Sequence, residues 1–211
     1  MATRFDHVVL GCLDLEAGVA DLSARIGAPP AGRGRHEAMS THNALWAMGD
    51  AYLELIAIDP EAPDPGRPRW FGLDEPSVHE RMAAGPRLLT WMAATNDPAA
   101  VARAAPAPFG PIETFSRDDL RWRLSVPLAG APALDGVFPG PISWLQGAHP
   151  SRRLGDQGLH CAAFTLSHPE IEAVTAAYGA LPRPIHLKPG PANLVLDLVT
   201  PKGLVSFRAF D

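Results

Sequence analysis

The sequence predicts an α+β fold in which a unit of one strand, one helix and several further strands occurs three times. Each third of the chain shows the same order of hydrophobic patterns, first strand-like, then helical, then strand-like again. The spacing of polar residues also repeats, because 47 positions separate His7 from Glu54 and 46 separate His160 from Ser206. Self-similarity at a fixed period is typical of an internal repeat. We therefore expect three related modules.

Proline-rich segments separate the regular parts of the chain. The 211 residues include 23 prolines, and many of them fall in residues 59–68 and 127–141, where no periodic pattern continues. These segments are expected to be loops that flank regular structure. The sequence predicts a first module at 1–60, a connector at 61–85, a second module at 86–148 and a third at 149–211, packed as one compact unit.

The first module begins with a strand at about 4–11. Asp14 is expected to cap the following helix, because its side chain can accept a hydrogen bond from a backbone N–H of the first turn. Apolar residues continue at helical spacing up to Ile26, and Gly27 is placed to end the helix. Strand-like runs at about 40–48 and 51–58 complete the module.

The second and third modules repeat this order. In the second, an apolar run at 88–94 is followed by Asp97 and Pro98, a pair typical of a helix start. In the third, a run at 158–166 is followed by Ser167 as the expected helix cap and by Gly179 as the expected stop. The remaining strands are expected near 111–116, 120–126, 141–146, 184–188, 193–199 and 203–209.

Composition and charge favour a globular protein with a small-molecule site. Hydrophobic residues make up 46% of the chain and charged residues 19%, enough to bury a core. The net charge of -5 provides no basic surface, so neither nucleic acid nor a membrane is expected as a partner. No run approaches the roughly 18 apolar residues of a membrane span, and the N-terminus has no signal-peptide pattern. These features predict a cytoplasmic protein.

Glu54 is the most informative single residue, because it lies within an apolar strand-like run at 52–58. A buried carboxylate must be neutralised, hydrogen-bonded, paired with a cation or bound to a metal. His7 lies in a similar run at 5–10, and the two side chains can face one concavity if their strands share a sheet. A core histidine bonded to a carbonyl, and a structural network around Glu54, are the alternatives.

Other enzyme motifs are incomplete. Residues 32–37 lack the third glycine of a dinucleotide fingerprint, and neither His36-Glu37 nor His79-Glu80 has the second histidine of a zinc protease helix. The sequence contains no P-loop and no serine elbow. Hydride transfer, NTP hydrolysis and peptidase chemistry are therefore not expected. Solvated positions are predicted for the histidines that neighbour charged, proline or loop residues, namely His36, His79, His149, His168 and His186.

Three motifs resemble the vicinal oxygen chelate superfamily, and within it the glyoxalase-like domain proteins. They are FDHVV at 5–9, STHNAL at 40–45 and GDAYLELI at 49–56, in the order typical of that family. The resemblance implies repeated βαβββ modules whose curved mixed sheets form an open cup around a metal or substrate. It also implies that the ligands come from the first and last strands of each module.

Transferred to this chain, the family pattern selects one pair of residues in each module. The pairs are His7 with Glu54, Thr90 with about Ser143, and His160 with Ser206. A divalent ion such as Zn, Mn, Ni or Fe prefers several imidazole or carboxylate ligands. His7, Glu54 and His160 supply such a set only if the third module closes the cup. If the second module closes it instead, the metal is expected to be weak or absent.

Candidate substrate contacts surround this pair in the sequence. His42 and Asn43 precede Glu54 by one strand, and strand alternation directs only one of them inward. His42 is either a ligand or substrate contact, or a capping or surface residue. Tyr52 and Trp144 are further candidates, although a tryptophan is more often part of a core than of a substrate wall.

The resulting hypothesis is a metal-dependent enzyme of the glyoxalase or dioxygenase type that acts on a small oxygenated metabolite as a lyase, isomerase or ring-cleaving enzyme. The metal would polarise a carbonyl or enediolate, while His7 and Glu54 act as catalytic groups. The alternative is a metal-free protein of the same fold that binds and sequesters a small molecule. Exposed sheet edges favour a homodimer in either case.

Overall fold

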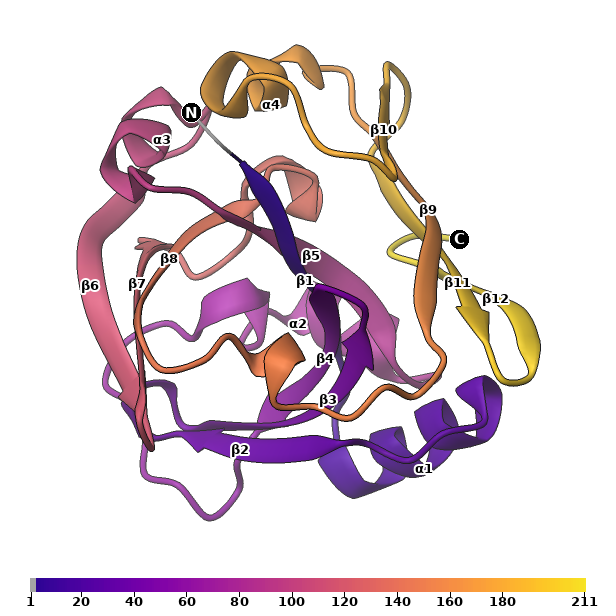
Figure 1. Ribbon diagram of the computed structural model, residues 1–211. Helices are drawn as coiled ribbons and strands as arrows, with labels where there is room; N and C mark the ends of the chain where they lie inside the picture. The colour runs from indigo at the N-terminus through magenta and orange to yellow at the C-terminus, as the bar shows by residue number, and fades with distance from the viewer. Residues whose placement is uncertain (1–2) are drawn as a thin grey trace.

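The computed structural model describes residues 3–211 and shows three successive strand-helix-three-strand units (Figure 1). The first contains β1 (Arg4–Gly11), α1 (Leu15–Ile26), β2 (Gly32–His36), β3 (Thr41–Met48) and β4 (Ala51–Ile58). The second contains β5 (Arg87–Ala94), α3 (Pro98–Ala104), β6 (Phe109–Arg117), β7 (Leu120–Pro127) and β8 (Gly140–Gln146). The third contains β9 (His160–Ser167), α4 (Glu172–Tyr178), β10 (Ile185–Lys188), β11 (Asn193–Thr200) and β12 (Gly203–Arg208).

The strands form two mixed sheets. Eight strands share one strongly curled sheet in the order β2-β3-β4-β1-β5-β8-β7-β6, and the last four form a second sheet in the order β10-β9-β11-β12 (Figure 1). Within the large sheet, β1 runs parallel to β4 and antiparallel to β5. The predicted fold of repeated βαβββ modules with curved mixed sheets around a cup is therefore confirmed.

Local sequence signals explain where the helices begin and end. Asp14 accepts a hydrogen bond from the Ala17 backbone N–H at 2.8 Å, and Gly27 ends α1 in the left-handed region with φ of 80°. The expected cap at Ser167 is wrong, because its hydroxyl donates to the Pro191 carbonyl and α4 begins only at Glu172. The Ser167 hydroxyl therefore makes a tertiary hydrogen bond to a distant loop instead of capping the helix.

Two elements were not expected from the sequence. The edge strand β2 is rich in glycine and arginine and pairs with β3 through register positions such as Gly34 opposite Asn43. The connector contains a short helix, α2 (Pro76–Met82), after a 3-10 turn at Trp70–Gly72. Pairing with an existing sheet has overridden the weak strand propensity of β2.

Strand alternation divides the core into two layers around the curled sheet. On β1, Val8 and Leu10 face the second sheet and pack with residues such as Phe164, whereas Val9 faces the concave side with Ile56 and the aromatic residues of the second module. His7 and Glu54 have the parity of the concave side. The curled sheet therefore directs them into its interior.

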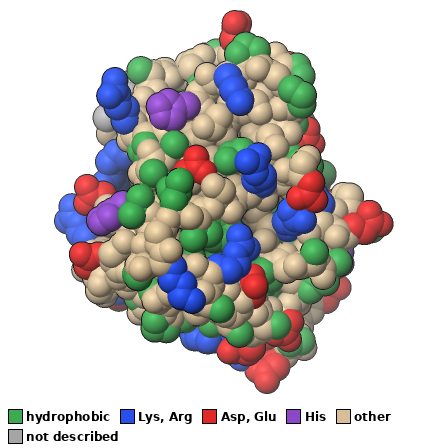
Figure 2. All heavy atoms as spheres, turned by 90° about the vertical axis from the view of Figure 1, so that its right-hand side faces the viewer, with side chains coloured by type: hydrophobic (Ala, Val, Ile, Leu, Met, Phe, Trp, Pro, Cys, Tyr) green, Lys and Arg blue, Asp and Glu red, His purple; other side chains and the backbone are tan. Residues whose placement is uncertain are grey.

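On the outer surface formed by α1 and the second sheet, acidic and basic side chains are intermixed, and hydrophobic side chains occur in small groups (Figure 2). Leu204 and Val199 are among the large hydrophobic residues that are exposed in the second sheet. Within residues 3–211, the structure has no helix long and apolar enough to cross a membrane.

Candidate functional site

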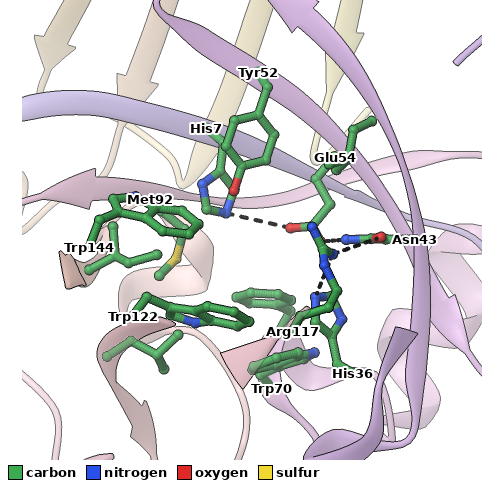
Figure 3. A pocket seen from close by; sticks show the side chains of 14 residues that line it. His7, His36, Asn43, Tyr52, Glu54, Trp70, Met92, Arg117, Trp122 and Trp144 are labelled. Carbon is green, nitrogen blue, oxygen red and sulfur yellow. Dashed lines mark hydrogen bonds and ion pairs between the residues drawn. The ribbon is translucent and has the colours of Figure 1, made fainter. Parts of the chain in front are cut away.

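The interior of the curled sheet holds a small cavity with one polar and one apolar wall (Figure 3). Its volume is about 40 Å³, room for a few water molecules. The polar side chains are His7, His36, Asn43, Tyr52, Glu54 and Arg117, and the apolar wall includes Leu45, Trp70, Phe71, Met92, Trp122, Leu124, Ile142 and Trp144. Every polar member except Arg117 comes from the first module, whereas most of the apolar wall comes from the second.

His7 and Glu54 face each other in this cavity, as the sequence predicted. Parallel pairing of β1 with β4 places His7 opposite Tyr52 and Val9 opposite Glu54, so both functional side chains lie on the concave face. His7 Nε2 lies 3.5 Å from Glu54 Oε2, and both residues are buried. The His7 ring stacks on Tyr52 with centroids 4.3 Å apart.

Asp6 orients the His7 ring from behind. A β-bulge between Phe5 and His7 interrupts the pairing of β1 with β5 and lets two successive side chains meet. Asp6 Oδ1 lies 2.7 Å from His7 Nδ1, while Asp6 Oδ2 accepts a hydrogen bond from Trp144 Nε1 at 2.9 Å. His149 Nε2 lies 3.2 Å from the same oxygen. This buried carboxylate therefore holds three aromatic side chains in place.

The charge of Asp6 determines the tautomer of His7. Burial by itself raises the pKa of Asp6, but hydrogen bonds from His149 and His7 outweigh it and hold that pKa well below its ordinary value. An ionised carboxylate only accepts hydrogen bonds, so His7 Nδ1 carries the proton in that bond. His7 Nε2 is then directed at Glu54 Oε2.

Asn43 connects Glu54 to the far edge of the sheet. Its Nδ2 donates to Glu54 Oε1 at 2.5 Å, and its Oδ1 accepts from Arg117 Nη1 at 3.4 Å. The structure thus selects Asn43 rather than His42 for the cavity, because His42 has the opposite strand parity and is absent from the lining. The hydrogen bond leaves Glu54 Oε2 directed at His7.

Tyr52 and Trp144, the other candidate contacts, both line the cavity. Burial, followed by the nearby charges of Asp6 and Glu54, raises the pKa of Tyr52 well above its ordinary value, so its hydroxyl stays protonated. The Trp144 ring packs edge-on against His149, with centroids 5.3 Å apart. His149 is therefore not the solvated loop residue that the sequence suggested.

The structure does not bring His160 to His7 and Glu54. His160 is an exposed residue at the start of β9, in the second sheet, and borders a different cavity of about 500 Å³ together with Arg4 and Arg183. Ser206 lies in the same second sheet, on β12. The second module, not the third, therefore forms the other half of the cup.

The second module supplies no metal ligand at the matching positions. Met92, not Thr90, stands opposite His7, and the Thr90 hydroxyl donates to the Gly136 carbonyl. On β8, Ile142 and Trp144 line the cavity, whereas Ser143 does not. Across residues 3–211 the structure contains no cluster of three or more His, Cys, Asp or Glu side chains suited to a metal ion. At the selected positions His7 and Glu54 are the donors that line the cavity, and two ligands are too few for a stable divalent-metal centre.

Sequence reasoning missed two further members of the cavity. His36 was assigned to a solvated position because β2 was not recognised, yet it lines the cavity and its pKa falls to about 3, mainly through burial and then through the charge of Arg117. Arg117 shares strand parity with Phe115, which is buried, and this parity was the available signal. The contact of Arg117 with His36 on the other edge strand was not predictable from the sequence.

The curled sheet around an interior cavity agrees with the glyoxalase-like architecture that the sequence predicts. A family model described as a glyoxalase-like domain matches residues 5–181, and the chain belongs to this family. The resemblance to the vicinal oxygen chelate superfamily is thereby confirmed. The search of curated proteins returned no match.

Several solved structures are similar to this chain at low sequence identity. A hypothetical protein from Staphylococcus aureus is 14% identical, with 99% of this chain and 85% of that chain covered and a TM-score of 0.55. A Streptomyces coelicolor methylmalonyl-CoA epimerase in complex with 2-nitronate-propionyl-CoA is 18% identical, with 70% and 100% covered and a TM-score of 0.44. The Mycobacterium tuberculosis methylmalonyl-CoA epimerase is 14% identical, with 69% and 89% covered and a TM-score of 0.44. At these identities the similarity concerns the fold alone.

Proposed function

We propose that this protein is an enzyme that transfers a proton to and from carbon in a small oxygenated molecule, as an isomerase, epimerase or lyase does. The observation that carries the proposal is the chain of three buried side chains from Asp6 through His7 to Glu54, which ends in a cavity. Pairs of titratable groups in a buried cavity are typical of acid-base sites.

The geometry supports separate roles for the two groups at the end of the chain. His7 Nε2 and Glu54 Oε2 lie 3.5 Å apart and both side chains line the cavity, so a substrate carbon next to the pair is within reach of a base and an acid. One group removes a proton from the carbon beside a carbonyl, and the other gives a proton to the carbonyl oxygen or back to the carbon. Asp6 is a positioning residue, because it touches only His7 and the aromatic groups behind it.

The metal-dependent reactions implied by the family resemblance are not part of this proposal. His7 and Glu54 supply two donors, whereas Met92, the cross-strand neighbour of His7, and Trp144 line the cavity from the second module. A thioether and an indole do not replace the carboxylate or imidazole ligands of a hard divalent ion. No step is therefore assigned to a metal.

Deuterium exchange tests the proposal without knowledge of the substrate. The protein is incubated in D2O with a panel of 2-oxo acids, 1,2-dicarbonyls and hydroxyketones, and exchange at the carbon beside the carbonyl is followed by NMR. We expect exchange above the buffer rate, insensitive to EDTA and lost in Glu54→Gln and His7→Asn. Glu172→Gln, a change at an exposed helix residue, is the matched control. Exchange that survives in both site variants contradicts the proposal.

A second candidate function is metal-free binding of a small apolar or aromatic compound without turnover. The observation in its favour is the aromatic wall, where Trp70, Trp122 and Trp144 surround the cavity. Quenching of tryptophan fluorescence by a panel compound, with no deuterium exchange in that compound, would favour this function. The predicted homodimer stays a prediction, tested by light scattering after size-exclusion chromatography.

A further inference from the structure

Arg117 is an unusual member of the cavity, because its guanidinium forms no ion pair within residues 3–211 and is linked to the carboxylate of Glu54 only through Asn43. The residue ends β6 and is partly buried, and its hydrogen bonds go to His36 Nε2 at 3.3 Å and Asn43 Oδ1 at 3.4 Å. Both contacts are long, and both acceptors are neutral groups. A guanidinium has five N–H donors, and both contacts involve Nη1, so the described part of the chain leaves most of its donors without a protein partner.

The fold places Arg117 in the cavity by bringing the two edge strands of the curled sheet together. Strand β6 is one edge and β2 the other, and Arg117 reaches across from β6 to His36 on β2 (Figure 3). Gly34 makes this approach possible, because a Cβ atom at position 34 would collide with Arg117 Nη1. The absence of a side chain on β2 thus leaves room for a guanidinium.

His36 stays uncharged beside Arg117. Burial, and then the charge of Arg117, lower the pKa of His36 to about 3, so the imidazole is neutral at physiological pH. The Arg117 charge is consequently not opposed by a second cation. Trp70, which also lines the cavity, has a buried Nε1–H without a hydrogen-bond partner among residues 3–211. The cavity thus contains unused donors but few unused acceptors apart from Glu54 and His7.

Beyond this polar end the interior is apolar. A second small cavity shares Trp70, Phe71, Met92 and Leu124 with the first and continues toward Phe109 and Phe138. Trp70 and Phe71 belong to the 3-10 turn of the connector, and Phe71 has a φ of 62°, a costly conformation for a bulky residue. These two rings line both cavities, so an occupant larger than a few water molecules requires them to move.

We infer that the ligand of this site is a carboxylate with an apolar or aromatic body, held through its anionic oxygens by Arg117. A guanidinium binds a carboxylate through paired, charge-assisted hydrogen bonds, and the aromatic wall takes the remainder of the molecule. The inference rests on the proposed function in placing the substrate in this cavity, and it narrows that substrate to a small organic acid.

Binding of a matched acid and amide tests the inference. The probes are 3-phenylpropanoate and the neutral, equally shaped 3-phenylpropanamide, and dissociation constants come from two-dimensional NMR titration that includes the arginine Nε–H signals. We expect the acid to bind about tenfold tighter than the amide and to shift the Arg117 signal. Arg117→Met should remove this preference while leaving amide binding unchanged, and Arg117→Lys should restore part of it.

Arg123→Met is the matched control, because it removes the same charge from an exposed position on the neighbouring strand β7. Thermal unfolding confirms that each variant is folded. Equal binding of acid and amide to the wild type, an equal loss of both in Arg117→Met, or no binding of either probe overturns the inference. Deuterium exchange is an independent measurement. If the acid binds in an Arg117-dependent way but no deuterium exchange occurs, the proton-transfer proposal is contradicted and the inference about the ligand is not.

Discussion

Asp6 Oδ1 lies 2.7 Å from His7 Nδ1, although the two residues are consecutive in one strand. In a regular strand such neighbours point to opposite faces. The bulge in β1 brings them to one side and converts the adjacent pair into a buried dyad directed at Glu54. The orientation of the candidate catalytic imidazole thus depends on a local irregularity of the backbone.

The stability of the protein should depend on the ionisation of Asp6. Its lowered pKa means that the charged form stabilises the native state fully above the unfolded pKa of 3.8, and that this contribution is lost as the pH falls below that value. We expect Asp6→Asn to lower the free energy of unfolding at neutral pH by about 2 kcal/mol and to flatten its decline in acid. Urea unfolding at neutral and acidic pH measures both, with Asp50→Asn as the exposed control; parallel pH curves would contradict the assignment.

The purified protein should retain far less than one equivalent of zinc, manganese, nickel or iron. The second module contributes Met92 and Trp144 to the cavity rather than carboxylate or imidazole groups, so the third and fourth ligands of a stable centre are missing. Elemental analysis of the wild type beside His7→Ala and Glu54→Ala, without chelator, tests this. Near-stoichiometric metal that disappears in both variants would restore the metalloenzyme hypothesis.

Mild acid should destabilise the protein through His36. Its folded pKa of about 3 lies below the ordinary value of 6.5, so between these values the unfolded chain binds a proton that the native protein excludes. Stability is therefore expected to fall as the pH drops below 6.5. His36→Gln should reduce the loss by about 2 kcal/mol between neutral pH and about pH 5, measured by urea unfolding. His186→Gln, at an exposed position, should leave the loss unchanged.

Gly34→Ala should disturb Arg117 without removing its charge. The new Cβ collides with the end of a flexible side chain, which can move away, so we expect a change of about 0.5 kcal/mol in unfolding free energy. Displacement of the guanidinium should abolish the preference for 3-phenylpropanoate over its amide. Gly155→Ala, where no atom lies within 4 Å of the added Cβ, is the control. If Gly34→Ala still prefers the acid over the amide, the position of the Arg117 guanidinium beside β2 does not determine acid binding.

Much of the fold was predictable because its signals are local. The Asp14 cap and the Gly27 stop act within a single turn of helix, and both are present as expected. Strand β2 escaped prediction because its glycines and arginines form a strand only by pairing with β3. Ser167 failed as a helix cap because its hydroxyl binds a carbonyl 24 positions away.

The candidate site was predictable in part. A carboxylate in an apolar strand, with a histidine of matching parity, was enough to identify Glu54 and His7. The other members depend on distant parts of the chain, since His149 reaches Asp6 across 143 positions and Arg117 reaches His36 across 81. No local pattern in the sequence predicts these long-range contacts.

The sequence by itself determined the repeated βαβββ order, the buried Glu54 and its partner His7, because hydrophobic period and the cost of burying charge operate within short segments. Only the tertiary structure decided which modules form the cup. It placed His160 outside, brought Met92 next to His7 and Trp144 next to Asp6, and brought the edge strands together so that Arg117 enters the cavity. Strand order and register are long-range choices, set by how whole sheets curl and pack.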